Sequence, residues 1–173
     1  MKFIIIGPAQ AGKSTAGRML AEILQTRATD TSEPITRVET ARIDGMLPPG
    51  PSVEDSPEWD HDRARPKRAN LIATGDALKL LSPTILVDYC FRQGDICVGV
   101  RRKDELDAAK RKYPDAKVLW VQADNVVDDN FDCEITQADY LLWNRKNGES
   151  KLKHEVAAVA VMSGALDTEP AAG

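Results

Sequence analysis

The chain has 173 residues, of which 42% are hydrophobic and 29% charged, and a formal net charge of −4 at pH 7. This length suits one domain with a hydrophobic core of its own, and no apolar run approaches the roughly 20 residues of a membrane span. The negative charge argues against broad, nonspecific binding of nucleic acid. It still leaves room for a local basic groove, because arginines gather between Arg37 and Arg111.

The first residues form a short apolar run, Lys2-Phe3-Ile4-Ile5-Ile6, which is typical of a buried strand and unlike a signal peptide. Residues 7–14 follow directly and match G-x-x-x-x-G-K-[ST], the phosphate-binding P-loop. Apolar residues at helical spacing then predict a helix from Thr15 to Leu24. The motif therefore lies between a strand and a helix, which is the context it requires.

The residue types of this motif suit phosphate chemistry. Gly7 and Gly12 permit backbone angles, and a closeness to phosphate, that a side chain would block. The loop N–H groups and the helix N-terminus form an anion cradle. Lys13 would neutralise the β- and γ-phosphates, and the Ser14 hydroxyl would bind Mg²⁺. We therefore expect ATP and Mg²⁺ as cofactors. The nucleotide-binding residues expected are Gly7, Pro8, Ala9, Gln10, Ala11, Gly12, Lys13, Ser14 and Thr15.

The middle of the chain is less regular. Residues 28–35 are expected to form a short strand that ends in a loop, and residues 37–43 a helical turn. Residues 46–60 hold four prolines and predict an irregular surface loop. That loop is either a mobile lid or a plain insertion.

Helices and strands alternate in the rest of the chain. The pattern predicts helices over 66–81, 83–93, 103–113 and 149–162, buried strands over 96–100 and 117–121, and a short strand over 140–143. Leu71, Ile72, Leu78 and Leu81 are expected to form the apolar stripe of their helix. The fold class is therefore α/β, with a parallel sheet covered by helices on both faces, of the P-loop kinase type. We expect one domain over 1–162 and a disordered tail over 163–173.

Ligands of such sheets bind at the carboxyl ends of the strands. Asp30 and Glu33 come at the end of the expected second strand, where a carboxylate can accept a proton from an attacking hydroxyl. Their alternative roles are those of turn and helix-capping residues. Arg68, Arg101 and Arg102 stand where a guanidinium can bind phosphate oxygens, although a solvated surface role is the alternative for each.

Two further groups of residues have weaker signals. Asp129-Asn130-Phe131-Asp132 and Asn144 flank the last strand, where they would either lie beside adenine or serve as turn residues. Cys90, Cys97 and Cys133 are too few and too widely spaced to predict a disulfide framework or a zinc site, which favours the cytoplasm.

The order of these motifs resembles the phage-type deoxynucleoside monophosphate kinases. The resemblance rests on the P-loop, Thr31-Ser32-Glu33-Pro34-Ile35, Arg68-x-x-Leu71-x-x-x-Gly75-Asp76, Val100-Arg101-x-x-x-Glu105 and Ala138-Asp139-Tyr140-x-x-x-Asn144. It covers roughly residues 1–160 and implies catalytic roles for Lys13, Asp30 or Glu33, and Arg101. Substrate binding would fall to Arg37, Arg68 and Arg102.

The chain departs from this family at two positions. Gly99 stands where the family pattern has an aspartate that would bind the metal, and Thr36 stands where it has a lysine. The chain is also similar to a branch that phosphorylates the hydroxymethyl group of 5-hydroxymethyluracil in phage DNA. That similarity lies in the segments Val-Gly-Val-Arg-Arg-Lys-Asp-Glu-Leu and Asp-Asn-Phe-Asp.

Three functions remain open from the sequence. The first is an ATP-dependent kinase acting on 5-hydroxymethyl-deoxyuridine in DNA, because an alcohol acceptor requires a base more than a second phosphate clamp. The second is a kinase of free deoxynucleoside monophosphates. The third is a nucleotide-binding ATPase or regulatory module without an acceptor. No membrane association or stable protein partner is expected.

Overall fold

The computed structural model describes residues 1–47, 59–60, 65–66, 68–124, 126, 128, 131–145 and 148–166. Five parallel strands form one sheet in the order β2-β5-β1-β6-β7. The strands are β1 (Phe3–Ile6), β2 (Ala28–Asp30), β5 (Ile96–Val100), β6 (Lys117–Ala123) and β7 (Tyr140–Asn144). The described helices are α1 (Lys13–Leu24), α2 (Ser32–Ile43), α3 (Arg68–Leu81), α4 (Ile85–Gln93), α5 (Lys103–Lys112) and α6 (Glu149–Met162).

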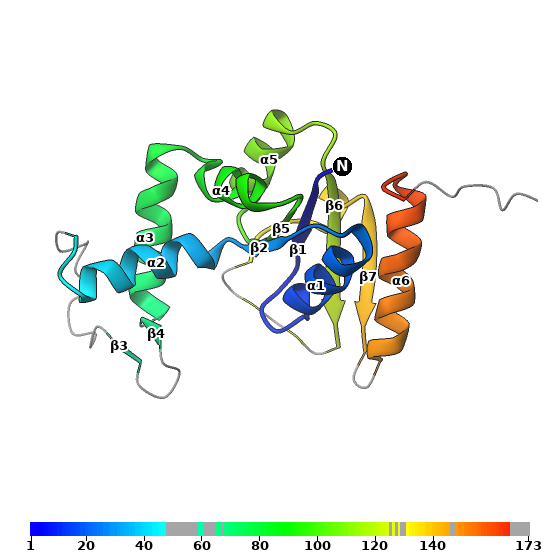
Figure 1. Cartoon of the computed structure of the whole chain (residues 1–173), viewed down its shortest axis with the longest axis horizontal. Coiled ribbons are helices and arrows are strands. Elements are labelled where there is room, and N and C mark those ends of the chain that lie inside the picture. Colours follow the sequence, from blue (N-terminus) through cyan, green and yellow to red (C-terminus); the bar gives the residue numbers. More distant parts are fainter. Residues whose placement is uncertain are drawn as a thin grey trace, which may run out of the picture.

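Helices cover both faces of the sheet, because the alternating side chains of each strand feed two separate cores (Figure 1). In β1, Phe3 and Ile5 pack with α1 and α6, whereas Ile4 and Ile6 pack with α4 and α5. All four side chains are fully buried, as expected for the central strand of a parallel sheet. The predicted fold class, an α/β sheet of the P-loop kinase type, is confirmed.

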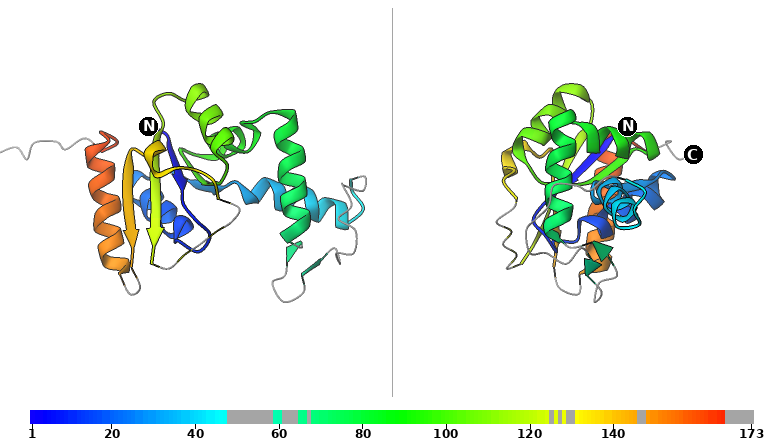
Figure 2. Two further views of the ribbon diagram at one scale, coloured as in Figure 1. Left: turned by 180° about the vertical axis from the view of Figure 1, so that it is seen from behind. Right: turned by 90° about the vertical axis from the view of Figure 1, so that its left-hand side faces the viewer.

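The remaining helices, α2 and α3, project beyond the edge strand β2 (Figures 1 and 2). They pack against each other, and the two-residue strands β3 (Trp59–Asp60) and β4 (Arg65–Pro66) pair antiparallel before α3. The expected loop over 28–35 is wrong beyond Thr31, because α2 begins at Ser32. Asp30 accepts hydrogen bonds from the backbone N–H and hydroxyl of Ser32 at 2.9 and 2.7 Å, which starts the helix. Pro34 is tolerated there because the first helical turn has no N–H partner to lose.

The expected apolar stripe of α3 is also wrong. Ile72 is 42% exposed and Leu81 is 78% exposed, whereas Thr74 and Gly75 are buried. The contact of α3 with α2 is made instead by the small residues Thr74 and Gly75 and by polar side chains. Arg42 donates to the Thr74 hydroxyl at 2.7 Å and pairs with the buried Glu39. A Cβ on Gly75 would lie 3.0 Å from the side chain of Ile35, so this glycine lets the two helices approach.

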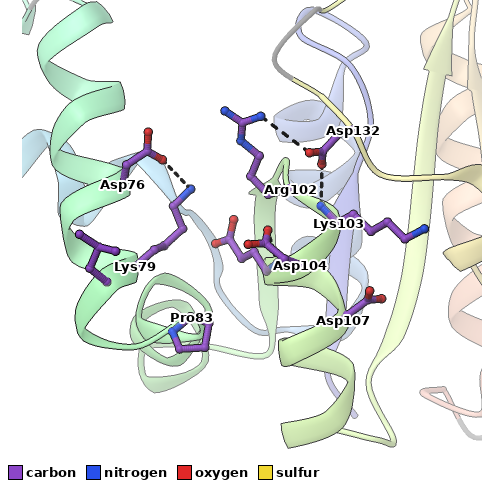
Figure 3. A pocket seen from close by; sticks show the side chains of 10 residues that line it. Asp76, Lys79, Pro83, Arg102, Lys103, Asp104, Asp107 and Asp132 are labelled. Atoms are coloured by element: carbon purple, nitrogen blue, oxygen red, sulfur yellow. Dashed lines mark hydrogen bonds and ion pairs between the residues drawn. The ribbon is translucent and has the colours of Figure 1, made fainter.

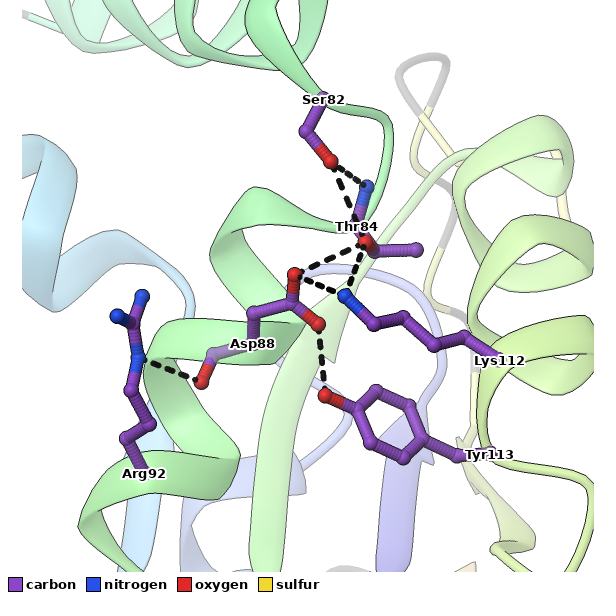
Figure 4. Close-up of polar contacts among 6 residues, drawn as sticks. All are labelled: Ser82, Thr84, Asp88, Arg92, Lys112 and Tyr113. Carbon is purple, nitrogen blue, oxygen red and sulfur yellow. Dashed lines mark hydrogen bonds and ion pairs between the residues drawn. The ribbon is translucent and has the colours of Figure 1, made fainter.

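A polar cluster joins α4 to the end of α5 (Figure 4). The carboxylate of Asp88 accepts hydrogen bonds from Lys112 and Tyr113 at 2.7 Å and from Thr84 at 3.0 Å. Burial alone would raise the pKa of Asp88, but these donors hold it below its ordinary value. Burial, together with the hydrogen bond to Asp88, raises the pKa of Tyr113 to about 12.

The end of the chain packs further than the sequence indicated. Residues 163–166 were placed in the disordered tail, yet Ala165 and Leu166 pack against the core cluster of α1 and α6. Residues 167–173 lie outside the described residues. The three cysteines are free and buried. None of the helices among the described residues has the length and apolar character needed to cross a membrane.

Adjacent leucines of β7 test the register of the sheet. Leu142 is 1% exposed and belongs to the core, whereas Leu141 is 49% exposed. We expect Leu142→Ala to lower the free energy of unfolding by about 2–5 kcal/mol, through lost burial and the cavity left behind. Leu141→Ala, the matched control, should cost less than about 1 kcal/mol. Urea unfolding measures both, and equal losses would contradict the register.

Candidate active site

The P-loop backbone is pressed against the carboxyl ends of two strands. Gly7 has φ +143°, and a Cβ there would lie 2.2 Å from the carbonyl oxygen of Val121. Gly12 has φ +94°, and a Cβ there would lie 2.2 Å from Nδ2 of Asn144. Asn144 also donates from Nδ2 to the carbonyl oxygen of Ala11 at 3.0 Å. The glycines are therefore required by close contact as well as by backbone angle.

Asn144 thus supports the loop from β7. Sequence reasoning placed it beside adenine or in a turn, and neither describes this contact. Phe131 packs edge-on against Trp120, with ring centroids 5.1 Å apart. Asp132 accepts the N–H of Lys103 at 2.6 Å and so caps α5. For Phe131 and Asp132, local structural roles fit better than adenine contact, while Asp129 and Asn130 lie outside the described residues.

Lys13 is 8% exposed at the start of α1, and its ammonium donates to the carbonyl oxygen of Pro8 at 2.6 Å. Burial, and then the nearby charge of Arg101, lower the pKa of Lys13 to about 8, against the opposing effect of Asp30 and Asp128. A phosphate group beside this ammonium would favour the charged form. The site therefore holds a cation whose environment lacks a full counter-charge.

Asp128 connects the P-loop with Arg101, the residue that follows strand β5. Its Oδ2 accepts the N–H of Ala9 and pairs with the guanidinium of Arg101, both at 2.8 Å. The side chain of Asp128 is only 3% exposed, whereas that of Arg101 is 39% exposed, so the pair is shielded from solvent on the Asp128 side alone. Sequence reasoning missed Asp128, and its place just after a buried strand was the signal that could have found it. The bridge positions Arg101 against the loop that would bind phosphate.

The Ser14 hydroxyl points at the carboxylate of Asp30, with Oγ 3.5 Å from Oδ2. This pair suits Mg²⁺, which binds proteins through few carboxylates and keeps waters and substrate phosphates as its other ligands. No group of three or more His, Cys, Asp or Glu side chains that could hold a metal is found among the described residues. The donors present therefore fit a metal shared with a nucleotide rather than one held by protein alone.

Gly99 leaves room for the carboxylate of Asp30. Gly99 has φ +98°, and a Cβ there would lie 3.0 Å from Oγ1 of Thr31 and 3.2 Å from Oδ1 of Asp30. A side chain at position 99 would therefore be strained and would crowd Asp30. The acidic group of this region comes from β2 instead of β5.

A cavity of about 400 Å³, here named the P-loop cavity, opens between the P-loop and helices α2 and α3. It brings together Lys13, Asp30, Arg68, Arg101 and Arg102, all predicted from the sequence. The other lining residues are Ala9, Gln10, Thr31, Ser32, Ile35, Leu71, Ile72, Gly75, Asp76, Lys79, Leu86, Gly99 and Glu105. The lining is therefore mixed, with apolar side chains, cationic side chains and the carboxylate of Asp30 in one cavity.

Glu33 and Arg37 do not line this cavity. Glu33 accepts hydrogen bonds from Arg27 at 3.1 Å, Arg37 at 2.9 Å and the Tyr89 hydroxyl at 3.2 Å. Its carboxylate is therefore engaged on the far side of the first turn of α2. The expectation that Glu33 serves as the base and Arg37 as a phosphate ligand is not supported by this geometry. Of the two carboxylates considered, Asp30 is the one that lines the cavity.

A second cavity, of about 640 Å³, lies between α3 and α5 and is named the α3–α5 cavity (Figure 3). It shares Asp76, Lys79, Arg102 and Glu105 with the P-loop cavity. Most of its further polar lining is acidic, namely Asp104, Asp107 and Asp132, with Lys103 beside them. Residues 48–58 of the expected lid loop lie outside the described residues.

Comparison with known proteins identifies no family. A scan against models of protein families found no match, and a search of curated proteins found no significant relative. The assignment of function therefore depends on the chemistry of the site.

The state of Lys13 sets an expected pH dependence. Below pH 8 its ammonium is charged and attracts phosphate, whereas above pH 8 the ligand-free protein must first bind a proton. We expect the affinity for ATP to fall roughly 25-fold between pH 7.5 and 9.5, in step with the charged fraction of Lys13, measured by isothermal titration calorimetry. Lys13→Ala should bind weakly with a flat profile. The exposed Lys153→Ala should keep the wild-type profile, and a flat wild-type profile would contradict this role.

Proposed function

We propose that the protein is an ATP-dependent phosphotransferase, a P-loop kinase. One observation carries the proposal: P-loop residues and side chains of α2 and α3 line the same cavity, which therefore extends beyond the P-loop. Lys13 of the P-loop lines that cavity together with Arg68 and Leu71 of α3. A module that only bound or hydrolysed ATP would have no need of such a second compartment.

The side chains would divide the reaction as follows. The P-loop N–H groups and Lys13 hold the phosphates of ATP, and Arg101 balances charge on the transferred group. Ser14 would hold Mg²⁺ together with ATP oxygens and water, and the metal would neutralise phosphate charge when bound. Asp30 accepts the proton of the acceptor hydroxyl while the oxygen of that hydroxyl bonds to the γ-phosphorus. The bond between that phosphorus and the β–γ bridging oxygen breaks, and ADP leaves.

The acceptor that we favour is the hydroxymethyl group of 5-hydroxymethyl-deoxyuridine in DNA. An alcohol must lose a proton on phosphorylation, and Asp30 lines the cavity beside Ser14 to accept it. Ile35, Leu71 and Leu86 offer an apolar wall for the face of a pyrimidine. Because the hydroxyl belongs to a base, that base would enter the cavity after leaving the base stack.

A free deoxynucleoside monophosphate is the second candidate acceptor. It is favoured by the cations that line the same cavity, Arg68, Lys79 and Arg102. A phosphate acceptor is already ionised and needs such cations more than it needs a base. The two candidates thus differ in whether Asp30 or the cations matter most.

Transfer of labelled γ-phosphate from ATP tests the proposal. We expect label in DNA that contains 5-hydroxymethyluracil and none in unmodified DNA. Lys13→Ala should reduce transfer by several orders of magnitude, since it removes charge stabilisation of the phosphoryl group. Label in a monophosphate alone would establish the second candidate. ATP hydrolysis without label in any acceptor would overturn the kinase assignment.

Two substitutions separate the carboxylates of the 30–33 segment. Asp30→Asn keeps an oxygen that can accept the Ser32 N–H but removes the base, so we expect kcat to fall about 100-fold or more. Glu33→Gln is the matched control, and it should change kcat only a few-fold because Glu33 faces Arg27 and Tyr89. Steady-state kinetics with the labelled acceptor measure both. A larger loss in Glu33→Gln would reverse the assignment.

A further inference from the structure

Glu105 is a buried carboxyl group that the proposed reaction does not use. It lies in the first turn of α5 and is 4% exposed. Its Oε1 is fully buried and has no hydrogen-bond partner among the described residues. Leaving such an oxygen unpaired destabilises the folded protein. An unpaired buried group on the shared wall of two cavities indicates a ligand that would supply the missing partner.

The surroundings of Glu105 favour its neutral form near neutral pH. Burial raises its pKa to about 7, against the attraction of Lys79 on α3 and Arg102 before α5. The other titratable neighbours are Asp76 and Asp104, whose charges also raise this pKa, and Cys97 and Cys133, whose own pKa values are raised in part by Glu105. As an acid, Glu105 presents one O–H donor beside one carbonyl acceptor.

We propose that Glu105, in its protonated form, binds the imide edge of a uracil-type base in the P-loop cavity. Because Oε1 is fully buried in the ligand-free protein, the side chain would turn so that both oxygens meet the ring. The acid carbonyl would then accept the N3–H of the ring, and the acid O–H would donate to the adjacent ring carbonyl. Both bonds require the donor and acceptor order that only the neutral acid offers, because a carboxylate would face the ring carbonyl with a second acceptor. This assignment rests on the proposed function for the presence of a pyrimidine in the cavity, and it makes Glu105 a specificity-determining residue.

The placement of Glu105 suits this role. The apolar side chains of Ile35, Leu71 and Leu86 line the same cavity and can pack against the faces of the ring. Asp30 and Lys13 line that cavity as well, so a base held at its edge by Glu105 would present its 5-substituent within the compartment of the reacting groups.

Binding of N3-methylated probes tests the proposal without phosphoryl transfer. The probes are 5-hydroxymethyl-deoxyuridine monophosphate and a short single-stranded oligonucleotide with one 5-hydroxymethyluracil, each with and without an N3-methyl group. At pH 6 we expect the methyl group to weaken binding to the wild-type protein about tenfold, since two hydrogen bonds are lost. At pH 8.5, where Glu105 is ionised, this preference should disappear.

Two variants provide the matched controls. Glu105→Gln keeps a donor beside an acceptor, so it should retain the preference at pH 6 and also at pH 8.5. Glu105→Ala should lose it at both pH values. Equal binding of both probe forms by the wild-type protein at pH 6, or no binding of either, would overturn the proposal. A preference that vanishes with pH in Glu105→Gln as it does in the wild type would also overturn it, even if Glu105→Ala failed to fold.

The transfer assay separates this inference from the proposed function. Transfer to an acceptor without discrimination against N3-methyl would overturn the role of Glu105 and leave the kinase intact. Discrimination in binding without any transfer would support the role of Glu105 and overturn the kinase.

Discussion

The structure depends on the close approach of the P-loop backbone to the ends of β6 and β7. At Gly7 and Gly12 the space for a Cβ is already taken, by a carbonyl oxygen of β6 and by the side chain of Asn144. These contacts hold the loop backbone against the two strands. They are possible because β1 lies between β5 and β6, so that three strands end close together. An anion that entered the loop would have to displace the bonds that the Ala9 N–H and the Lys13 ammonium make to Asp128 and Pro8.

The carboxylates of the site follow from the same geometry. Asp30 ends β2 beside Gly99 of β5, and the absence of a side chain at position 99 gives its carboxylate room. Asp128 reaches the loop from the segment after β6 and secures Arg101. Each acid comes from a different connection, yet all of them lie at the carboxyl edge of one sheet. This is where side chains from distant parts of the chain meet in an open α/β fold.

Much of this arrangement could be predicted from the sequence, and the failures have physical causes. The buried strands and the helix over 149–162 were predictable because apolar periodicity reflects burial on one or both faces. The start of α2 was missed because Pro34 resembles a loop signal, while the cap at Asp30 depends on a side-chain contact. The exposed Leu81 was misjudged because α3 packs on α2 through Thr74 and Gly75, which carry no apolar pattern.

In the candidate site, too, some residues could be predicted from the sequence and others only from the fold. The P-loop was readable because its chemistry lies in consecutive residues. Glu33 and Asp30 are three positions apart and chemically alike, so only the direction of each side chain distinguishes them. Asp128 and Glu105 were harder still, because their significance comes from partners, or from the lack of one, that the fold supplies. Local motifs are thus visible in the sequence, whereas pairing and burial are properties of the folded chain.

The reactivity of the buried thiols depends on whether helices α4 and α5 stay packed on the sheet. Cys90, Cys97 and Cys133 all belong to the core beneath α4 and α5. Burial raises the pKa of the Cys97 thiol and brings that of Cys133 to about 12, so little of the reactive thiolate forms in the closed state. An alkylating reagent would therefore modify these residues only when that layer separates from the sheet. The rate of alkylation would then measure the local stability of the face that carries Glu105, independently of any catalytic activity.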